Sequence, residues 1–180
     1  VFNMFKSGDY IIYGSTGVCL VADIFIPESI ADLGEERLYY KLTPLLGSEI
    51  IYVPVDAPVF MRPIITKGQA EALIDKIPEI SSSDFEGKDR RQTVESYKLS
   101  IGTHNCEDLI KLIKAVYCKT QNLIKCGKKP GQTDTQYLKQ AETLLHSELA
   151  TALNIPFDDV PTYIAAKLSN TEQKDAMQNQ

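Results

Sequence analysis

The side chains that could do chemistry in this chain of 180 residues are few. They are four cysteines and two histidines: Cys19, Cys106, Cys118, Cys126, His104 and His146. His104 and Cys106 could contribute to a zinc site, but the spacings match no common zinc pattern. Without a C-x-x-C pair, the cysteines favour reduced thiols over disulfides or metal ligation. We therefore expect no metal, and acid–base catalysis by either histidine only through a tertiary arrangement that the sequence does not reveal.

A glycine-lysine loop is the one segment that resembles a phosphate-binding motif. Residues 126–134 are CGKKPGQTD, without a preceding strand and without the G-x-x-x-x-G-K-[ST] spacing that lets backbone amides surround phosphates. The sequence also holds no G-x-S-x-G, H-E-x-x-H or dinucleotide-binding fingerprint. We therefore expect neither an enzyme, nor a cofactor, nor a small-molecule substrate.

Charge is unevenly distributed along the chain, whose net charge is −5. Residues 1–80 hold 6 Lys/Arg and 11 Asp/Glu, whereas residues 109–133 hold six lysines and no acid. These lysines are Lys111, Lys114, Lys119, Lys125, Lys128 and Lys129. Such a local positive charge fits a phosphate-binding surface, and an ordinary solvated helix face is the alternative.

The elements that position these side chains change character along the chain. β-Branched and aromatic runs predict strands over residues 9–13, 18–25, 37–42, 49–53 and 59–62, with a tight turn over 14–17. Five short strands joined by tight turns predict a small, strongly curved barrel of the Tudor-like kind. Such barrels are usually binding modules.

Beyond the strands, the apolar period changes from two to 3.6 and predicts helices. We expect Thr66 to cap a short helix through Ile77, with a boundary at the serine-rich stretch 81–84. Further helices are expected over residues 90–101, 105–125 with Gly127 as the C-cap, a third capped by Thr133 or Asp134, and 160–168, before a frayed polar end. The predicted fold class is α+β, a five-stranded barrel followed by a helical bundle. The predicted domains are 1–66, a linker over 67–84, and a helical domain over 85–180.

Several segments, taken in order, resemble the CarD/CdnL family of bacterial RNA-polymerase-binding transcription regulators. They are Phe5 to Tyr13, Gly17, Tyr39 to Leu42, Val53 to Asp56, Arg62 to Ile65, Gly127 to Lys129 and Glu148 to Ala150. The resemblance implies that the barrel docks on the β subunit of RNA polymerase. It also implies that the helical domain contacts promoter DNA at the upstream edge of the bubble and modulates open-complex stability, largely without reading sequence.

For polymerase binding, the resemblance points to residues near one barrel edge. Strand 49–53 is the candidate for pairing with a partner strand. Ile26, Pro27, Ile50 and Tyr52 are the expected partner-binding residues, and the alternative is that Tyr52 only covers the barrel.

For DNA binding, the family places a tryptophan wedge at the start of the helical domain, and this chain has no tryptophan. Phe85 is the nearest aromatic residue and would serve as a smaller wedge, or else as a core residue. The expected DNA-binding residues are Phe85, Lys88, Arg90, Arg91, Lys128 and Lys129. A protein-only adaptor whose helical domain binds another protein is the alternative function. The sequence lacks an apolar run of membrane-spanning length and a signal-peptide pattern, which favours the cytoplasm.

Overall fold

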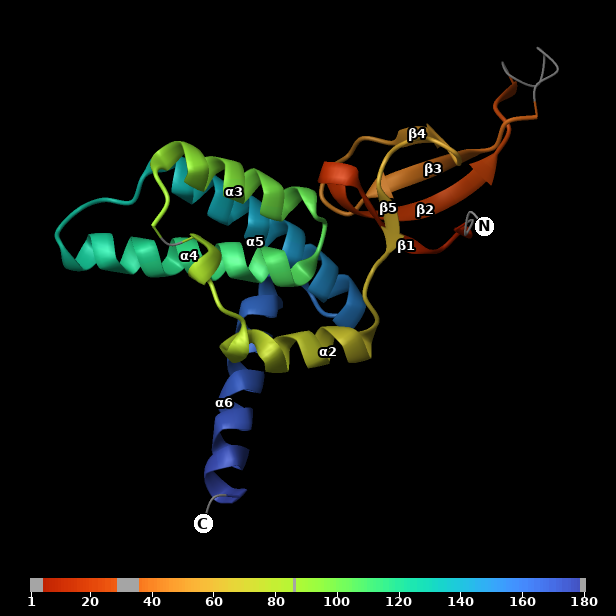
Figure 1. The fold of residues 1–180 in the computed structure, drawn as a ribbon. Coiled ribbons are helices and arrows are strands. Elements are labelled where there is room, and N and C mark those ends of the chain that lie inside the picture. Colours follow the sequence, from red (N-terminus) through yellow and green to blue (C-terminus); the bar gives the residue numbers. More distant parts are fainter. Residues whose placement is uncertain (1–4, 29–35, 86, 179–180) are drawn as a thin grey trace. The chain divides into compact units, whose positions relative to one another are not determined.

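The computed structural model describes residues 5–28, 36–85 and 87–178. The chain divides into two compact units, Val1–Ile64 and Ile65–Gln180 (Figure 1). The first unit is a β-sheet and the second is helical, so the predicted α+β fold class is confirmed.

The first unit is a five-stranded antiparallel sheet with the strand order β4-β3-β2-β1-β5. Its strands are β1 (Tyr10–Tyr13), β2 (Gly17–Phe25), β3 (Tyr39–Pro44), β4 (Ile51–Pro54) and β5 (Met61–Pro63). Its core consists of side chains from the first four strands: Ile11, Cys19, Val21, Tyr40, Leu42 and Val53. The five predicted strands are all present, each within a few residues of its expected bounds.

Glycines make the β1–β2 hairpin possible. Gly14–Thr16 form a single 3-10 turn, and Gly17 pairs with Tyr13 across the hairpin. Gly14 and Gly17 have φ angles of 44° and 88°, which side chains with a Cβ rarely adopt. A bulge between Val21 and Asp23 then shifts the β2–β3 register by one residue.

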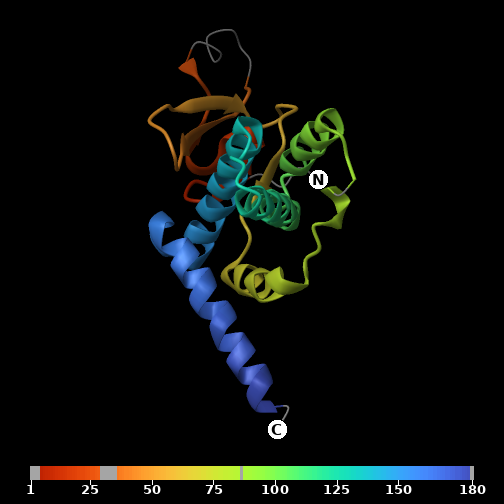
Figure 2. The same cartoon turned by 90° about the vertical axis from the view of Figure 1, so that its left-hand side faces the viewer.

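The second unit contains five helices in the part of the chain that the structure describes. They are α2 (Lys67–Lys76), α3 (Arg90–Gly102), α4 (Cys106–Lys125), α5 (Gln132–Leu153) and α6 (Val160–Gln178). Their shared core includes the fully buried Ala70, Ile74, Leu112, Val116, Ala141, Leu149 and Val160. Figures 1 and 2 show α6, in blue, running on beyond the other helices toward the C-terminus.

Local capping explains where most of these helices begin and end. The Thr66 side chain accepts a hydrogen bond from Gln69 N while Gln69 caps in return, as a capping box. Asp89 and Gln92 form the same arrangement at α3. At the end of α4, Gly127 has φ 72° and the Lys128 N–H donates to Leu123 O at 2.8 Å, which closes the helix in a Schellman-type turn.

Three helical features differ from the sequence predictions. Helix α2 buries Ala70, Leu73 and Ile74 in the helical core, so it belongs to the second unit and the division falls at Ile64, not within a linker over 67–84. The N-cap of α5 is Gly131, because the Asp134 carboxylate is engaged in tertiary contacts. Helix α6 continues to Gln178, well past the expected end at Leu168.

Candidate functional site

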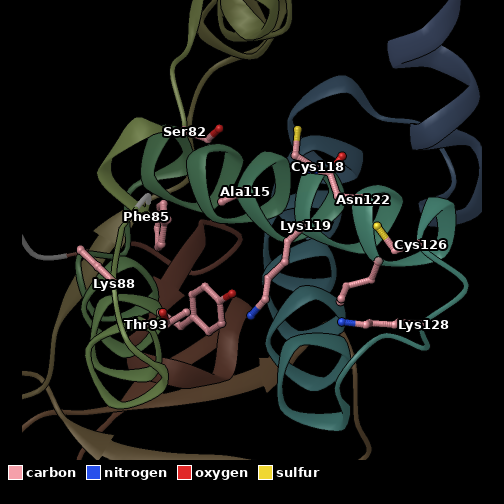
Figure 3. Close-up of a pocket in the computed structure, with 12 residues that line it drawn as sticks. Ser82, Phe85, Lys88, Thr93, Ala115, Cys118, Lys119, Asn122, Cys126 and Lys128 are labelled. Carbon is pink, nitrogen blue, oxygen red and sulfur yellow. The ribbon is translucent and has the colours of Figure 1, made fainter.

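A pocket of about 450 Å³ opens in the helical unit between α3, α4 and the 3-10 turn Ser83–Phe85 (Figure 3). Aromatic, cationic, hydroxyl, amide and thiol groups line it together. The pocket is lined by Ser82, Phe85, Lys88, Thr93, Tyr97, Ala115, Cys118, Lys119, Asn122, Leu123, Cys126 and Lys128. They come from four stretches of sequence that only the tertiary fold brings together.

Aromatic rings form one wall of this pocket. The Phe85 ring is half-buried and lies 5.7 Å from the Tyr97 ring, centroid to centroid. Tyr97 in turn packs against Tyr137 at 5.3 Å. Phe85 therefore packs against the helical core and also borders the pocket. It is neither a fully buried core residue nor a side chain that projects freely like a wedge.

A buried carboxylate, that of Asp134, contacts two residues that line the pocket, Tyr97 and Lys119. Asp134 is 7% exposed and accepts a hydrogen bond of 3.0 Å from the hydroxyl of Tyr97, which is 1% exposed. The Lys119 ammonium lies 2.8 Å from the other carboxylate oxygen. Burial, followed by the negative charge of Asp134, raises the pKa of Tyr97 well above its usual range. Tyr97 therefore remains a protonated hydrogen-bond donor, and Lys119 is held at the pocket wall.

The six predicted DNA-binding residues separate into two groups. Phe85, Lys88 and Lys128 line the pocket, and the Lys88 ammonium lies 5.6 Å from the centre of the Phe85 ring. Lys88 also donates a 2.6 Å hydrogen bond to the Ser96 hydroxyl. The other three residues are exposed outside the lining: Arg90 and Arg91 in the first turn of α3, and Lys129 in the α4–α5 loop.

The predicted partner-binding strand has two distinct faces. Val53 is buried in the sheet core and Ile51 packs against it, whereas Ile50 and Tyr52 are 50% and 57% exposed. The alternation along β4 therefore directs Ile50 and Tyr52 outward. The ring of Tyr52 meets that of Phe25 edge-on at a centroid distance of 5.9 Å.

Tyr52 and Pro27 line a second pocket on the sheet surface, together with Asp23, Phe25, Glu28, Tyr39 and Lys41. Ladder pairing explains this grouping, because Lys41 pairs with both Asp23 and Tyr52, and Tyr39 pairs with Phe25. Ile26 is exposed but does not line this pocket, and neither does Ile50.

The two edge strands differ in what their backbones offer. Just beyond the β3–β4 ladder the Val55 N–H donates to Leu38 O at 3.0 Å, so by antiparallel alternation the Tyr52 N–H and C=O point to the free edge. On β5, the Ile64 N–H donates to Tyr10 O, so the same alternation turns Pro63 outward. Proline has no N–H, which makes β4 the better edge for pairing with another strand.

The residues considered for metal binding have structural contacts. Cys106 is buried and its thiol lies 3.2 Å from Glu148 Oε2, while Glu148 Oε1 accepts a hydrogen bond from Ile65 N. His104 follows α3 with φ 54°. Among the described residues, no group of three or more His, Cys, Asp or Glu side chains is placed to hold a metal ion. Within the same residues, no helix is both long and apolar enough to cross a membrane.

The sequence predictions missed the pocket as a whole, two of its lining residues, Tyr97 and Lys119, and the Asp134 carboxylate that contacts both. Lys119 was noted only as part of the lysine-rich stretch, and Asp134 was expected to cap a helix. The contact between Tyr97 and Asp134 spans 37 residues, so no local pattern reports it. The one available signal is that Asp134 is the first acid after six lysines.

Comparison with known families gives one result. The model of the CarD-like/TRCF RID domain matches residues 5–65, which covers the sheet unit. That family is an RNA-polymerase-interacting, non-enzymatic protein-interaction domain. A search of curated proteins finds no match to the chain. Residues 5–65 of this chain are therefore similar to the CarD-like/TRCF RID domain, which confirms for the N-terminal unit the resemblance found in the sequence.

Proposed function

We propose that this protein is a cytoplasmic transcription regulator that docks on the β subunit of RNA polymerase and contacts promoter DNA at the upstream edge of the bubble. The observation that carries the proposal is the match of the sheet unit to an RNA-polymerase-interacting domain. The β subunit, the position on DNA and the effect on open-complex stability come from the resemblance to CarD/CdnL regulators.

The β4 edge supports a polymerase contact by strand addition. Its outward Tyr52 N–H and C=O are groups that a partner strand can pair with, and its exposed Ile50 and Tyr52 side chains flank them. Backbone pairing supplies affinity, while the surface pocket beside Tyr52 supplies side-chain selectivity. In this proposal Pro27 contributes through that pocket, and Ile26 and Ile50 contribute as exposed apolar neighbours.

The distribution of lysines in the helical unit supports a DNA contact. Lys88, Lys119 and Lys128 gather at one pocket, and Arg90, Arg91 and Lys129 add exposed cations. Contacts of this kind neutralise phosphates, so they bind DNA without reading its sequence. Modulation of open-complex lifetime follows if these contacts are made only when the bubble is open.

Binding of the full chain to purified bacterial RNA polymerase tests the first half of the proposal. Tyr52→Pro removes the outward N–H and places a ring at the free edge, whereas Tyr52→Ala removes only the side chain. We expect Tyr52→Pro to weaken binding at least about tenfold more than Tyr52→Ala, because a strand partner loses a hydrogen bond and meets a steric block. Tyr10→Ala, which removes a partly exposed tyrosine from the non-edge strand β1, is the matched control and should bind normally.

Salt dependence of DNA binding tests the second half. Affinity for bubble DNA should fall steeply as salt rises, and Lys128→Ala with Lys129→Ala should reduce the slope of log K against log salt by about two. Intact polymerase binding without any salt-dependent DNA binding would favour a protein-only adaptor instead. Turnover of a nucleotide by the purified chain would contradict both readings.

A further inference from the structure

The pocket between α3 and α4 combines groups that recognise different parts of one ligand. Phe85 offers an aromatic wall, Lys88 and Lys128 offer cations at the rim, and Thr93 and Asn122 offer polar groups. We propose that this pocket binds a single unpaired nucleotide of the melted promoter strand, with the base against Phe85 and its phosphates at Lys88 and Lys128. This inference rests on the proposed function and deepens it by naming the ligand of the helical unit.

The packing of Phe85 argues against a free wedge and for a receiving wall. The Phe85 ring lies 5.7 Å from the Tyr97 ring, centroid to centroid, and packs against the helical core. The Lys88 ammonium lies 5.6 Å from the centre of the same ring, so this side chain would move toward the phosphate when a base enters. Leaning out into a DNA groove would cost this packing, whereas a base that leaves its own stack can enter the pocket. Extruding an unpaired base costs little, since its partner strand is already separated at a bubble. Stacking of a base on an aromatic side chain is worth about 1 to 3 kcal/mol in single-strand binders.

Charge around the pocket favours an anion. The lining includes three lysines, Lys88, Lys119 and Lys128. Asp134 forms an ion pair with Lys119 and does not neutralise the other two. In Figure 3, Lys88 and Lys128 lie on opposite sides of the pocket, with Lys119 extending between them from α4. A nucleotide has a flat neutral base and a negatively charged phosphate. The aromatic wall suits the base, and the lysines at the rim suit the phosphate.

Hydrogen-bonding groups at the same pocket suit a base edge. The Thr93 hydroxyl donates to Asp89 O at 2.7 Å and keeps lone pairs that can accept. Asn122 is exposed on α4, and its amide offers two donors and an acceptor. The pocket therefore has a place for a flat ring, for its polar edge and for its phosphate.

Two exposed cysteines can report whether this pocket is occupied. Cys118 and Cys126 are exposed and both line the pocket, whereas Cys19 and Cys106 are buried. Burial raises the pKa of the Cys19 thiol to about 11, which further suppresses its reactivity. A ligand seated in the pocket should therefore slow alkylation of Cys118 and Cys126, while the buried thiols stay unreactive throughout.

The experiment measures alkylation rates of the full chain with three probes: bubble DNA, fully paired duplex of the same sequence, and the free mononucleotide dTMP. At a salt concentration where both DNAs bind, we expect bubble DNA to slow the reaction of Cys118 and Cys126 about tenfold or more, and the duplex to leave it nearly unchanged. Equal protection by duplex and bubble would overturn the proposal, because shielding would then come from the backbone contact alone. Protection by dTMP at lower concentrations than bubble DNA would assign the pocket to a free nucleotide and overturn the DNA assignment.

A pocket-filling variant supplies the second arm. Ala115→Leu narrows the pocket without changing any charge, and Ala166→Leu on the exposed surface of α6 is the matched control. We expect Ala115→Leu to abolish the preference for bubble over duplex DNA while duplex affinity and the melting temperature remain within error. An unchanged preference in a folded Ala115→Leu protein would refute the pocket proposal.

The Cys118→Phe variant obstructs the rim of the pocket from an exposed position. If Ala115→Leu fails to fold, Cys118→Phe should give the same loss of preference for bubble DNA, and an unchanged preference would again refute the proposal. Failure of both DNAs to bind the unmodified chain would instead refute the proposed function.

Discussion

The two units of this protein offer partners different kinds of groups. The sheet unit offers the backbone of one short edge strand, β4, with the exposed side chain of Tyr52 beside it. The helical unit offers side chains collected from α3, α4, the turn before α3 and the loop after α4. A strand edge is built from consecutive residues, whereas the helical pocket exists only after residues as distant as Phe85 and Lys128 have come together.

This contrast fits the extent of the family match. A sheet of this topology needs glycines at fixed turns and apolar residues in alternation, and such a pattern can be read directly from the sequence. The family model matches residues 5–65 and stops where the helical unit begins. The surface of a helical bundle can change one side chain at a time while the core is kept, so its binding groups leave a weaker pattern.

The largest effect should come from testing whether the two cores are energetically separate. Leu42 is fully buried in the sheet core and Leu149 in the helical core. Each change to alanine should destabilise its own unit by about 2 to 5 kcal/mol, through lost burial and the cavity left behind. Hydrogen exchange resolved by residue would locate each loss. If either variant lowered protection from hydrogen exchange equally in both units, the two units would form one cooperative core and would not be energetically separate.

A smaller loss should follow from breaking the buried network behind the pocket. Asp134→Ala leaves the Tyr97 hydroxyl without its acceptor and Lys119 without its counter-ion. We expect the free energy of unfolding to fall by about 1 to 3 kcal/mol, and Asp134→Asn to cost less because its amide oxygen can still accept from Tyr97. Asp158→Ala, at an exposed position, is the control in chemical denaturation. A loss as small as that of the control would show that the network does not stabilise the helical unit.

The sequence predicted the elements better than it predicted their contacts. The hairpin at Gly14–Gly17, the cap at Thr66 and the turn at Gly127 rest on local backbone preferences, and the structure contains all three. The role of α2 depended on which surface its apolar residues meet, and it packs in the helical core where a linker was expected. Asp134 shows the same limit, since an acid near a helix start can cap locally or bind a distant tyrosine, and only the fold decides.

The candidate sites follow the same rule. Alternation along strand 49–53 predicted only that Tyr52 and Ile51 lie on opposite faces, and the resemblance pointed to Tyr52 as the contact residue. The structure exposes the Tyr52 side chain. Phe85 could not be placed from sequence, because its surroundings come from α3 and α4 and include Tyr97 and Lys119. The three exposed cations Arg90, Arg91 and Lys129 stay a prediction that DNA binding must test.

A modest pH dependence should arise in the helical unit. His146 on α5 packs against the Phe157 ring at 6.0 Å, and burial lowers its pKa. Its folded state therefore binds fewer protons than its unfolded state, so stability is complete above the unfolded pKa of about 6.5 and falls as pH drops below it. His146→Gln should remove this part of the acid sensitivity in melting experiments between pH 7 and 5. Burial raises the pKa of Glu142, which therefore changes stability in the opposite direction at lower pH. Because Glu142 is present in both the unmodified protein and the His146→Gln variant, the difference between their melting temperatures reports the histidine alone. If the His146→Gln variant lost as much stability between pH 7 and 5 as the unmodified protein does, groups other than His146 would cause the acid sensitivity.

The smallest expected effect concerns how each unit handles left-handed backbone. In the described part of the sheet unit, positive φ angles fall on glycines, whereas the helical unit also uses Asn154 with φ 55° and His104 with φ 54°. Asn154 closes α5, where its N–H donates to Thr151 O at 3.3 Å. Asparagine tolerates this conformation better than alanine does, so Asn154→Ala should cost about 1 kcal/mol, near the lower end of the left-handed penalty. Asn154→Gly should change stability by only a few tenths of a kcal/mol in magnitude, because relief of strain is offset by the greater entropy of the unfolded chain. If alanine and glycine gave equal stabilities in denaturant melts, Asn154 would not hold this conformation in solution, and the difference between the two units would then depend on His104.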